Sequence, residues 1–210
     1  CLDSKTGQRE FVPVGSLVGA KHLGVGSTHV CALMKDDTVG CVGTGFDGTT
    51  TSAKLQREPY VDYVEASPIA GLTGATDLAA GVFFTCALLT DRTVGCWGIM
   101  MSTGSGTAGL IMSSTPVAVG NVEMVSEVAA GGQHACALLV DGRVSCWGDN
   151  QYGELAGGTA MSVPPTVVSG LPRAIEVSTG VTFNCALLAD DRVACWTGAT
   201  ADNPTILMGT

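Results

Sequence analysis

Short apolar stretches alternate with polar turn residues along the chain, and the unit is clearest around residues 124–168. Apolar residues alternate with small or polar ones over 134–139 and 143–147, and Asp141 and Gly142 stand between the two stretches. Alternation of this kind on both sides of a turn signal predicts a β-hairpin. Further strands are expected near 124–128 and 166–168, so the unit is predicted to be a sheet of four short strands.

The hairpin pattern recurs four times as one phrase, Cys-Ala-Leu-x-x-Asp-x-x-Val-x-Cys. Its second Cys falls at positions 41, 96, 146 and 195, which gives periods of 55, 50 and 49 residues. A period of about 50 residues with several short strands in each unit is typical of β-propeller blades. We therefore predict an all-β chain of about four blades, each with four antiparallel strands, that makes an incomplete propeller.

The spacing within the phrase sets a register for the two cysteines. A three-residue loop over 140–142 places Gly142 in the left-handed conformation that ends such a turn. In the other copies this position holds Asp37, Arg92 and Asp191, and Arg92 fits it poorly. The register makes the two Cys residues cross-strand neighbours, close enough for a disulfide.

Four disulfides are therefore predicted, each contributing about 3 kcal/mol of stability in the chain-entropy model. The pairs are Cys31 with Cys41, Cys86 with Cys96, Cys136 with Cys146, and Cys185 with Cys195. Cysteines packed in reduced form as small core residues are the alternative. Zinc is disfavoured, because the sequence has no Cys-x-x-Cys and no His at ligand spacing.

Composition limits the partners and the cellular compartment that we expect for the protein. The formal net charge is −9 and the ten basic residues form no run, which disfavours nucleic acid as a partner. No apolar stretch approaches the ~18 residues that a membrane span needs. Nine cysteines, eight of them in four evenly spaced pairs, fit an oxidising compartment, so we expect an extracellular or cell-surface protein.

Residue types that often act in catalysis, metal binding or cofactor binding are expected to have structural roles in this sequence. His29 and His134 precede the first Cys of their copies by two positions, where the other copies hold Phe84 and Phe183, so packing is the expected role. The acids at 36, 91, 141 and 190 are expected to cap turns. The Gly-x-Gly-x-x-Gly run at 104–109 lacks the following helix of a dinucleotide site. We therefore predict no catalytic residue, no cofactor and no metal.

Residues 131–155 carry a family resemblance. The run Gly-Gly-Gln-His-Ala-Cys-Ala-Leu-Leu-Val-Asp-Gly-Arg-Val-Ser-Cys-Trp-Gly-Asp-Asn, followed by Tyr-Gly-Glu-Leu, resembles the regulator-of-chromosome-condensation repeat. The Cys-bearing form is similar to bacterial secreted members and to crinkly-type ectodomains of plant receptor kinases. Val42 departs from the pattern, where the repeat has Trp, and Thr197 stands where it has Gly.

The resemblance implies a scaffold rather than one activity. Family members include an exchange factor for a small GTPase, an inhibitor of β-lactamase and receptor ectodomains, all of which bind protein through propeller faces or loops. The family usually closes seven blades, which four units do not supply. Function does not follow from the fold alone.

Two long segments interrupt the period, at 44–60 and 99–115. The second is expected to be an inserted loop, and its apolar residues are the candidates for binding a protein partner. They are Ile99, Met100, Met101, Leu110, Ile111 and Met112. Alternatively, they cover the end of their own propeller.

Residues 1–210 are predicted to form a single domain, in which 1–14 end a preceding blade and central hairpins span 27–43, 82–98, 132–148 and 181–198. Cys1 then has its partner outside this sequence. A lipidated Cys1 and an intermolecular disulfide are the alternatives.

The expected function is a non-enzymatic, extracellular protein-binding module on a disulfide-linked propeller. The alternative is a structural subunit of a cell-surface fibre or sheath, in which neighbouring copies of the chain complete the blades.

Overall fold

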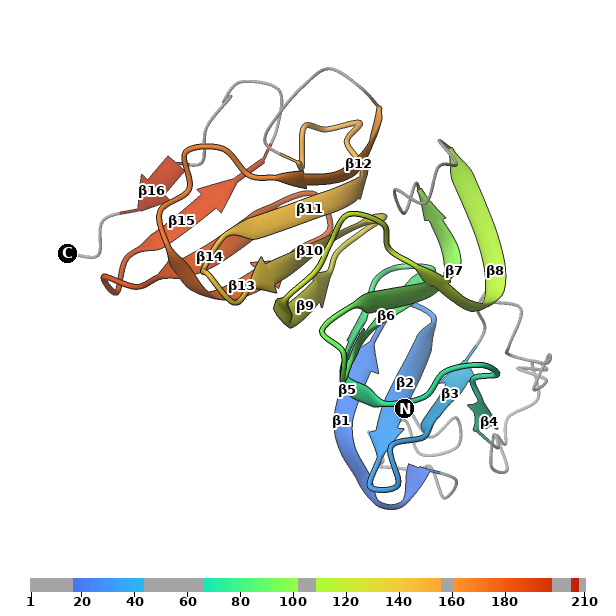
Figure 1. Ribbon diagram of the computed structural model, residues 1–210. Coiled ribbons are helices and arrows are strands. Elements are labelled where there is room, and N and C mark those ends of the chain that lie inside the picture. The colour runs from blue at the N-terminus through green and yellow to red at the C-terminus, as the bar shows by residue number, and fades with distance from the viewer. Residues whose placement is uncertain (1–16, 44–65, 102–108, 156–160, 198–204, 208–210) are drawn as a thin grey trace, which may run out of the picture.

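The computed structural model describes residues 17–43, 66–101, 109–155, 161–197 and 205–207. These residues form sixteen β-strands, and no α-helix occurs among them. The strands make four antiparallel sheets of four strands, numbered here as blades 1 to 4 in chain order (Figure 1). Within each blade, consecutive strands are neighbours in the sheet. The predicted all-β fold with four-stranded blades is confirmed.

The strand bounds follow the repeat. Blade 1 contains β1 (Ala20–Val25), β2 (His29–Met34), β3 (Val39–Gly43) and β4 (Ser67–Pro68). Blade 2 contains β5 (Ala75–Ala80), β6 (Phe84–Leu89), β7 (Val94–Met101) and β8 (Leu110–Ala118). Blade 3 contains β9 (Val125–Ala130), β10 (His134–Leu139), β11 (Val144–Asp149) and β12 (Ser162–Val167). Blade 4 contains β13 (Ala174–Thr179), β14 (Asn184–Leu188), β15 (Val193–Trp196) and β16 (Thr205–Leu207).

The blades follow one another along an open arc (Figure 1). Their first strands lie side by side, because β1 contacts β5, β5 contacts β9 and β9 contacts β13. Glycines allow this close approach: a Cβ added at Gly81 would lie 2.5 Å from the carbonyl oxygen of Gly131, and one added at Gly131 would lie 2.3 Å from that of Gly180. The arc is an incomplete propeller, as the sequence predicts.

The central hairpin of each blade has the predicted register. Cys136 pairs directly with Cys146 across β10 and β11, and the other three Cys pairs occupy equivalent positions. Each pair forms a disulfide, with S–S distances between 2.06 and 2.14 Å. Each hairpin turns with a left-handed residue, at Gly142 (φ 86°), Asp37 (φ 65°), Arg92 (φ 64°) and Asp191 (φ 65°). The predicted loop geometry is confirmed, even at Arg92.

The core lies between blades rather than within one sheet. We call the side of a blade that meets the next blade its forward face, and the opposite side its back face. The forward face of blade 2, with Phe84, Cys86 and Val94, packs against the back face of blade 3, with Val128 and Trp147. Blades 1 and 2 meet in the same way, as do blades 3 and 4. Burial of these apolar faces holds the arc together.

The structure corrects the expectation of an inserted loop over 99–115. Ile99–Met101 and Leu110–Thr115 are parts of β7 and β8, in which Ile99 pairs with Met112 and Met101 pairs with Leu110. The segment therefore lengthens the outer hairpin of blade 2. Residues 102–108 lie outside the described residues, as do the long segment 44–60, Cys1 and the predicted blade ending at 1–14.

Candidate functional site

The four turn acids act within their own turns. Oδ1 of Asp36 accepts hydrogen bonds from the Thr38 hydroxyl (2.7 Å) and the Thr38 amide (3.2 Å), and Asp91 holds Thr93 in the same way. Asp141 and Asp190 instead bind the side chain and amide of an Arg two residues on. These hydrogen bonds lower the pKa of all four carboxyl groups, because they favour the ionised form. The predicted turn-capping role is confirmed.

The two recurrent histidines are buried between blades. His29 Nε2 lies 2.8 Å from the Thr85 hydroxyl oxygen, and His134 Nε2 lies 2.8 Å from Oδ1 of Asn184. The Asn184 amide nitrogen donates to the Glu154 carbonyl (2.6 Å), so Oδ1 accepts and His134 carries its proton on Nε2. Burial lowers the pKa of His134. Both histidines join blades, as their exchange with Phe84 suggests.

Thr85 and Asn184 are functional partners that the sequence interpretation did not identify. They occupy equivalent positions, each paired across the hairpin with the blade's Trp, and blade 3 has Ala135 there. When a blade has His29 or His134, the next blade has a polar residue at this position. When a blade has Phe84, the next blade has Ala135 there. This correlated change is visible when the four copies are compared position by position.

The lengthened hairpin of blade 2 carries the candidate binding residues, which the register divides between two faces. Met100 pairs with Ile111, and both contribute to the core, where Met100 is only 3% exposed. The opposite face carries the other four: Ile99, Met101, Leu110 and Met112. We call these four residues the hairpin patch. Leu110 is 59% exposed and Met112 is 62% exposed, so this face is open to solvent.

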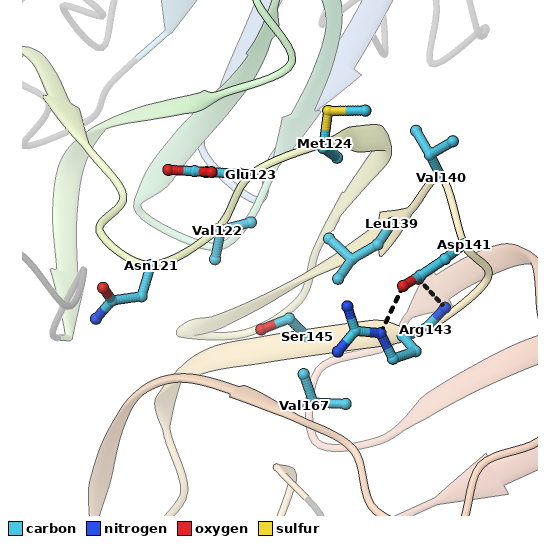
Figure 2. A pocket seen from close by; sticks show the side chains of 10 residues that line it. All are labelled: Asn121, Val122, Glu123, Met124, Leu139, Val140, Asp141, Arg143, Ser145 and Val167. Atoms are coloured by element: carbon cyan, nitrogen blue, oxygen red, sulfur yellow. Dashed lines mark hydrogen bonds and ion pairs between the residues drawn. The ribbon is translucent and has the colours of Figure 1, made fainter.

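A groove of about 630 Å³ lies beside the turn of blade 3 (Figure 2). The segment from Asn121 to Met124 lines one side, and the hairpin tip with Val140 and Asp141 lines the other. Asp141 binds Arg143 at 2.7 Å, so the charged pair in the groove is internally neutralised. Aliphatic side chains make up much of the remaining wall, which also carries the carboxylate of Glu123.

No cluster of three or more His, Cys, Asp or Glu side chains in the described part of the chain has metal-binding geometry. The described residues contain no helix that is long and apolar enough to cross a membrane. Of the Gly-x-Gly-x-x-Gly run, only Gly109 lies within the described residues.

Four-stranded blades with a disulfide across each central hairpin define an open β-propeller. Within it, residues 125–154 and 141–187 match two models of the Regulator of chromosome condensation (RCC1) repeat. Residues 125–187 therefore carry RCC1 repeats, which confirms the resemblance noted in the sequence. No curated protein matches the sequence.

Solved structures agree on the fold. The complex of Kap60 bound to yeast RCC1 (Prp20) contains a chain that matches with a TM-score of 0.76 at 20% identity, covering 95% of this chain and 51% of that one. Human WBSCR16 matches at 0.72 and 20% identity, over 90% and 52%. The ectodomain of the receptor kinase CR4 from Physcomitrella patens matches at 0.52 and 24% identity, over 83% and 40%. The chain thus spans about half the length, or less, of these solved chains.

Proposed function

We propose that this chain is a non-enzymatic, extracellular protein-binding module, and that the hairpin patch of blade 2 contacts the partner. The single observation that carries the proposal is the pairing of four apolar side chains on one solvent-facing side of β7 and β8. Apolar residues that gather on a protruding element favour protein contact, because burying them in an interface removes apolar surface from water.

Comparison between blades supports the hairpin patch. The outer hairpin of blade 3 ends in the pair Asp149 and Ser162, both polar, whereas blade 2 continues to the pair Met101 and Leu110. Strand β7 has 8 residues and β11 has 6. The extension buries Met100 in the core, but it leaves Leu110 and Met112 on the opposite face exposed to solvent.

The proposed extracellular location rests on the disulfides, and the proposed class of partner rests on solved proteins with the same fold. Four disulfides persist where thiols are oxidised, as outside the cytosol. One structural relative is described as a receptor-kinase ectodomain, and another as yeast RCC1 in complex with the protein Kap60. Both descriptions fit a scaffold that binds proteins.

The test is a binding comparison between two matched variants. Secreted and surface proteins of the source cells are passed over the immobilised chain, over Leu110→Ser/Met112→Ser, and over Met124→Ser. Met124 is 57% exposed but lies outside the hairpin patch. We expect a partner retained by the wild type and by Met124→Ser to be lost from the double variant. Retention of every bound protein by a folded double variant contradicts the proposal.

The alternative function, a structural subunit of a surface fibre or sheath, has a separate basis. Blade 4 already has its fourth strand, because β16 pairs with β15, so it does not need a strand from a neighbouring chain. A neighbouring copy in such a fibre would have to cover exposed apolar residues on the outer faces of blades 1 and 4, such as Leu23 and Phe183.

A further inference from the structure

Strand β8 lies at the outer edge of blade 2, and one side of its backbone is open (Figure 1). The sheet order is β5, β6, β7 and β8, and no described residue pairs with the far side of β8. Strand β8 has 9 residues, whereas the described outer strands β4, β12 and β16 have 2, 6 and 3 residues. A long edge of this kind presents a row of unpaired N–H and C=O groups with which another strand can pair.

The hydrogen bonds of β7 show which backbone groups of β8 face outward. The Ile99 amide donates to the Phe83 carbonyl, on the side of β6, at 2.8 Å. Since the amide and carbonyl of one strand residue face the same neighbour, Ile99 makes no ladder hydrogen bond with Met112, its partner in β8. The amide and carbonyl of Met112 therefore face away from β7, and those of Leu110, two residues earlier, do the same.

The equivalent edge of blade 3 is interrupted by proline. The Asp149 amide donates to the Gln133 carbonyl, so Ser162, the partner of Asp149 in β12, has its backbone groups facing outward. The next outward position along β12 is Pro164, which has no N–H to donate. Strand β8 has no proline before Pro116, so its first six residues lack this protection against edge pairing.

The edge of β8 also lacks the protection that charged side chains give. No residue between Arg92 and Glu123 has a charged side chain, although the net charge of the chain is −9. Charges on an edge strand oppose pairing, and a large net charge keeps protein molecules apart. Two copies of this acidic chain can therefore approach each other along β8 with less repulsion than along a charged part of the surface.

We propose that β8 of one copy of this chain pairs antiparallel with β8 of a second copy, which joins the two blade 2 sheets into one. The second copy supplies what the edge requires: an unpaired backbone, no charge, and exposed apolar side chains at the alternate positions Leu110 and Met112. Both copies use the same surface, so the contact is isologous and closes at two copies.

The proposed contact goes beyond the proposed function and leaves it possible. The two-fold axis of an antiparallel edge pair is perpendicular to the joined sheet, so the hairpin patches of both copies lie on the same face of that sheet. The backbone edges are covered, while that face stays open to a protein partner. The dimer would present two hairpin patches side by side.

The first test measures association by sedimentation velocity up to about 100 µM, a range in which micromolar affinities are visible. We expect the wild type to dimerise and Met112→Pro to weaken dimerisation by about tenfold or more, because the facing carbonyl loses its donor. Proline fits this position, since the amide that it removes faces outward. Ser162→Pro makes the same change on the edge of blade 3 and should dimerise like the wild type. A monomeric wild type, or equal dimerisation of a folded Met112→Pro variant, overturns the proposal.

A second variant keeps the backbone donors and changes only the charge. Met112→Lys places a positive charge on both sides of the junction and should weaken dimerisation by about threefold or more at low ionic strength. Met161→Lys is the matched control, because Met161 is 67% exposed and lies on blade 3. Equal dimerisation of the two Lys variants contradicts pairing along β8.

Hydrogen exchange locates the contact. The outward amides of Leu110 and Met112 should exchange quickly in the monomer and slowly in the dimer, because pairing gives each amide an acceptor. Exchange at about 5 and 100 µM, followed by mass spectrometry with fragmentation, should therefore show protection of these two amides that rises with concentration, and no change at Ser162. A dimer in which the exchange of Leu110 and Met112 does not depend on concentration overturns the proposal.

Dimerisation and partner binding fail separately. Dimerisation is measured without a partner, and Leu110→Ser/Met112→Ser keeps every amide of the edge. A monomeric chain whose partner is lost only from this double variant overturns the β8 contact and supports the proposed function. A dimer protected at Leu110 and Met112, whose double variant still retains every bound protein, supports the β8 contact and contradicts the proposed function.

Discussion

His134 and Asn184 meet across the junction of blades 3 and 4, with Nε2 of the imidazole 2.8 Å from Oδ1 of the amide. Both side chains are buried, and the Asn184 amide nitrogen also binds the Glu154 carbonyl. The pair therefore fixes two blades and the chain segment after β11 to one another. The equivalent junction between blades 2 and 3 has Phe84 and Ala135 instead. The chain itself thus provides the apolar replacement for this pair.

We predict strong coupling between these two positions. Asn184→Ala should lower the free energy of unfolding by about 1–3 kcal/mol, because it leaves the buried His134 ring without its acceptor. His134→Phe should cost a similar amount, because Oδ1 of Asn184 loses its donor. The double variant, which copies Phe84 and Ala135, should cost less than the sum of the single changes. Urea unfolding of the four proteins measures this coupling, and additive costs would refute it.

Because His134 is buried, we also predict that the free energy of unfolding depends on pH. Burial lowers its pKa in the folded state, so the unfolded chain binds the proton more readily. Stability should therefore fall as pH drops below about 6.5, the value of an unperturbed His, towards the lowered pKa of the folded state. The slope should be smaller in the His134→Phe/Asn184→Ala variant. Thermal unfolding between about pH 7 and pH 5 compares the two, and identical slopes would exclude the assignment to His134.

Carboxyl groups also affect how the stability measured in this experiment depends on pH. The pKa of Glu154 is raised, mainly by burial, so stability from this group grows as pH falls through its folded pKa. The difference between wild type and variant isolates His134, because Glu154 is present in both. The turn acids have lowered pKa values, so their contribution is lost only at lower pH, below about 3.9.

Arg92 adopts the left-handed conformation that Gly142 adopts in blade 3. Because a side chain in this conformation costs about 1–2 kcal/mol, Arg92→Gly should stabilise the protein by up to about that amount. Gly142→Ala is the reverse change and should destabilise it, since a Cβ there would lie 2.4 Å from Cγ of Arg173. Differential scanning calorimetry of both variants checks the pair. A lower melting temperature for Arg92→Gly would show that its side chain makes compensating contacts.

The disulfides should differ in their resistance to reduction. Cys185–Cys195 lies on the partly exposed forward face of blade 4, whereas the other three pairs are buried. Since thiol–disulfide exchange requires access to the sulfur, mild reduction should open Cys185–Cys195 first. Timed alkylation followed by peptide mass spectrometry gives the order. Simultaneous reduction of all four pairs would contradict this order, and free thiols before reduction would contradict the disulfides themselves.

Several features of the fold follow from local spacing. The ten-residue separation of Cys136 and Cys146, together with Gly142, fixes the hairpin register, because a side chain on a strand alternates between faces with a period of two. The exchange of His for Phe at positions 29, 84, 134 and 183 indicates a packing role, since one structural environment accepts both rings. The central hairpins consist of β2–β3, β6–β7, β10–β11 and β14–β15, while the division of 1–210 into one domain with the predicted hairpin ranges stays a prediction.

Other features depended on contacts between distant parts of the chain. The Gly, Ser and Thr around Met100 suggest a loop, but pairing with Ile111 and burial against blade 3 make the segment a strand, because tertiary packing outweighs weak local preference.

The sequence by itself determined the repeat, the hairpin register, the cysteine pairing and the turn acids, because these depend on residues within about ten positions of one another. Only the tertiary structure decided which polar residue meets each histidine, which side of the β7–β8 hairpin faces solvent, and which blade faces are left uncovered. Burial at Phe183 or Leu23 is a property of the neighbouring blade, about 50 residues away in the repeat. Four nearly identical phrases therefore differ in exposure solely through their place along the arc.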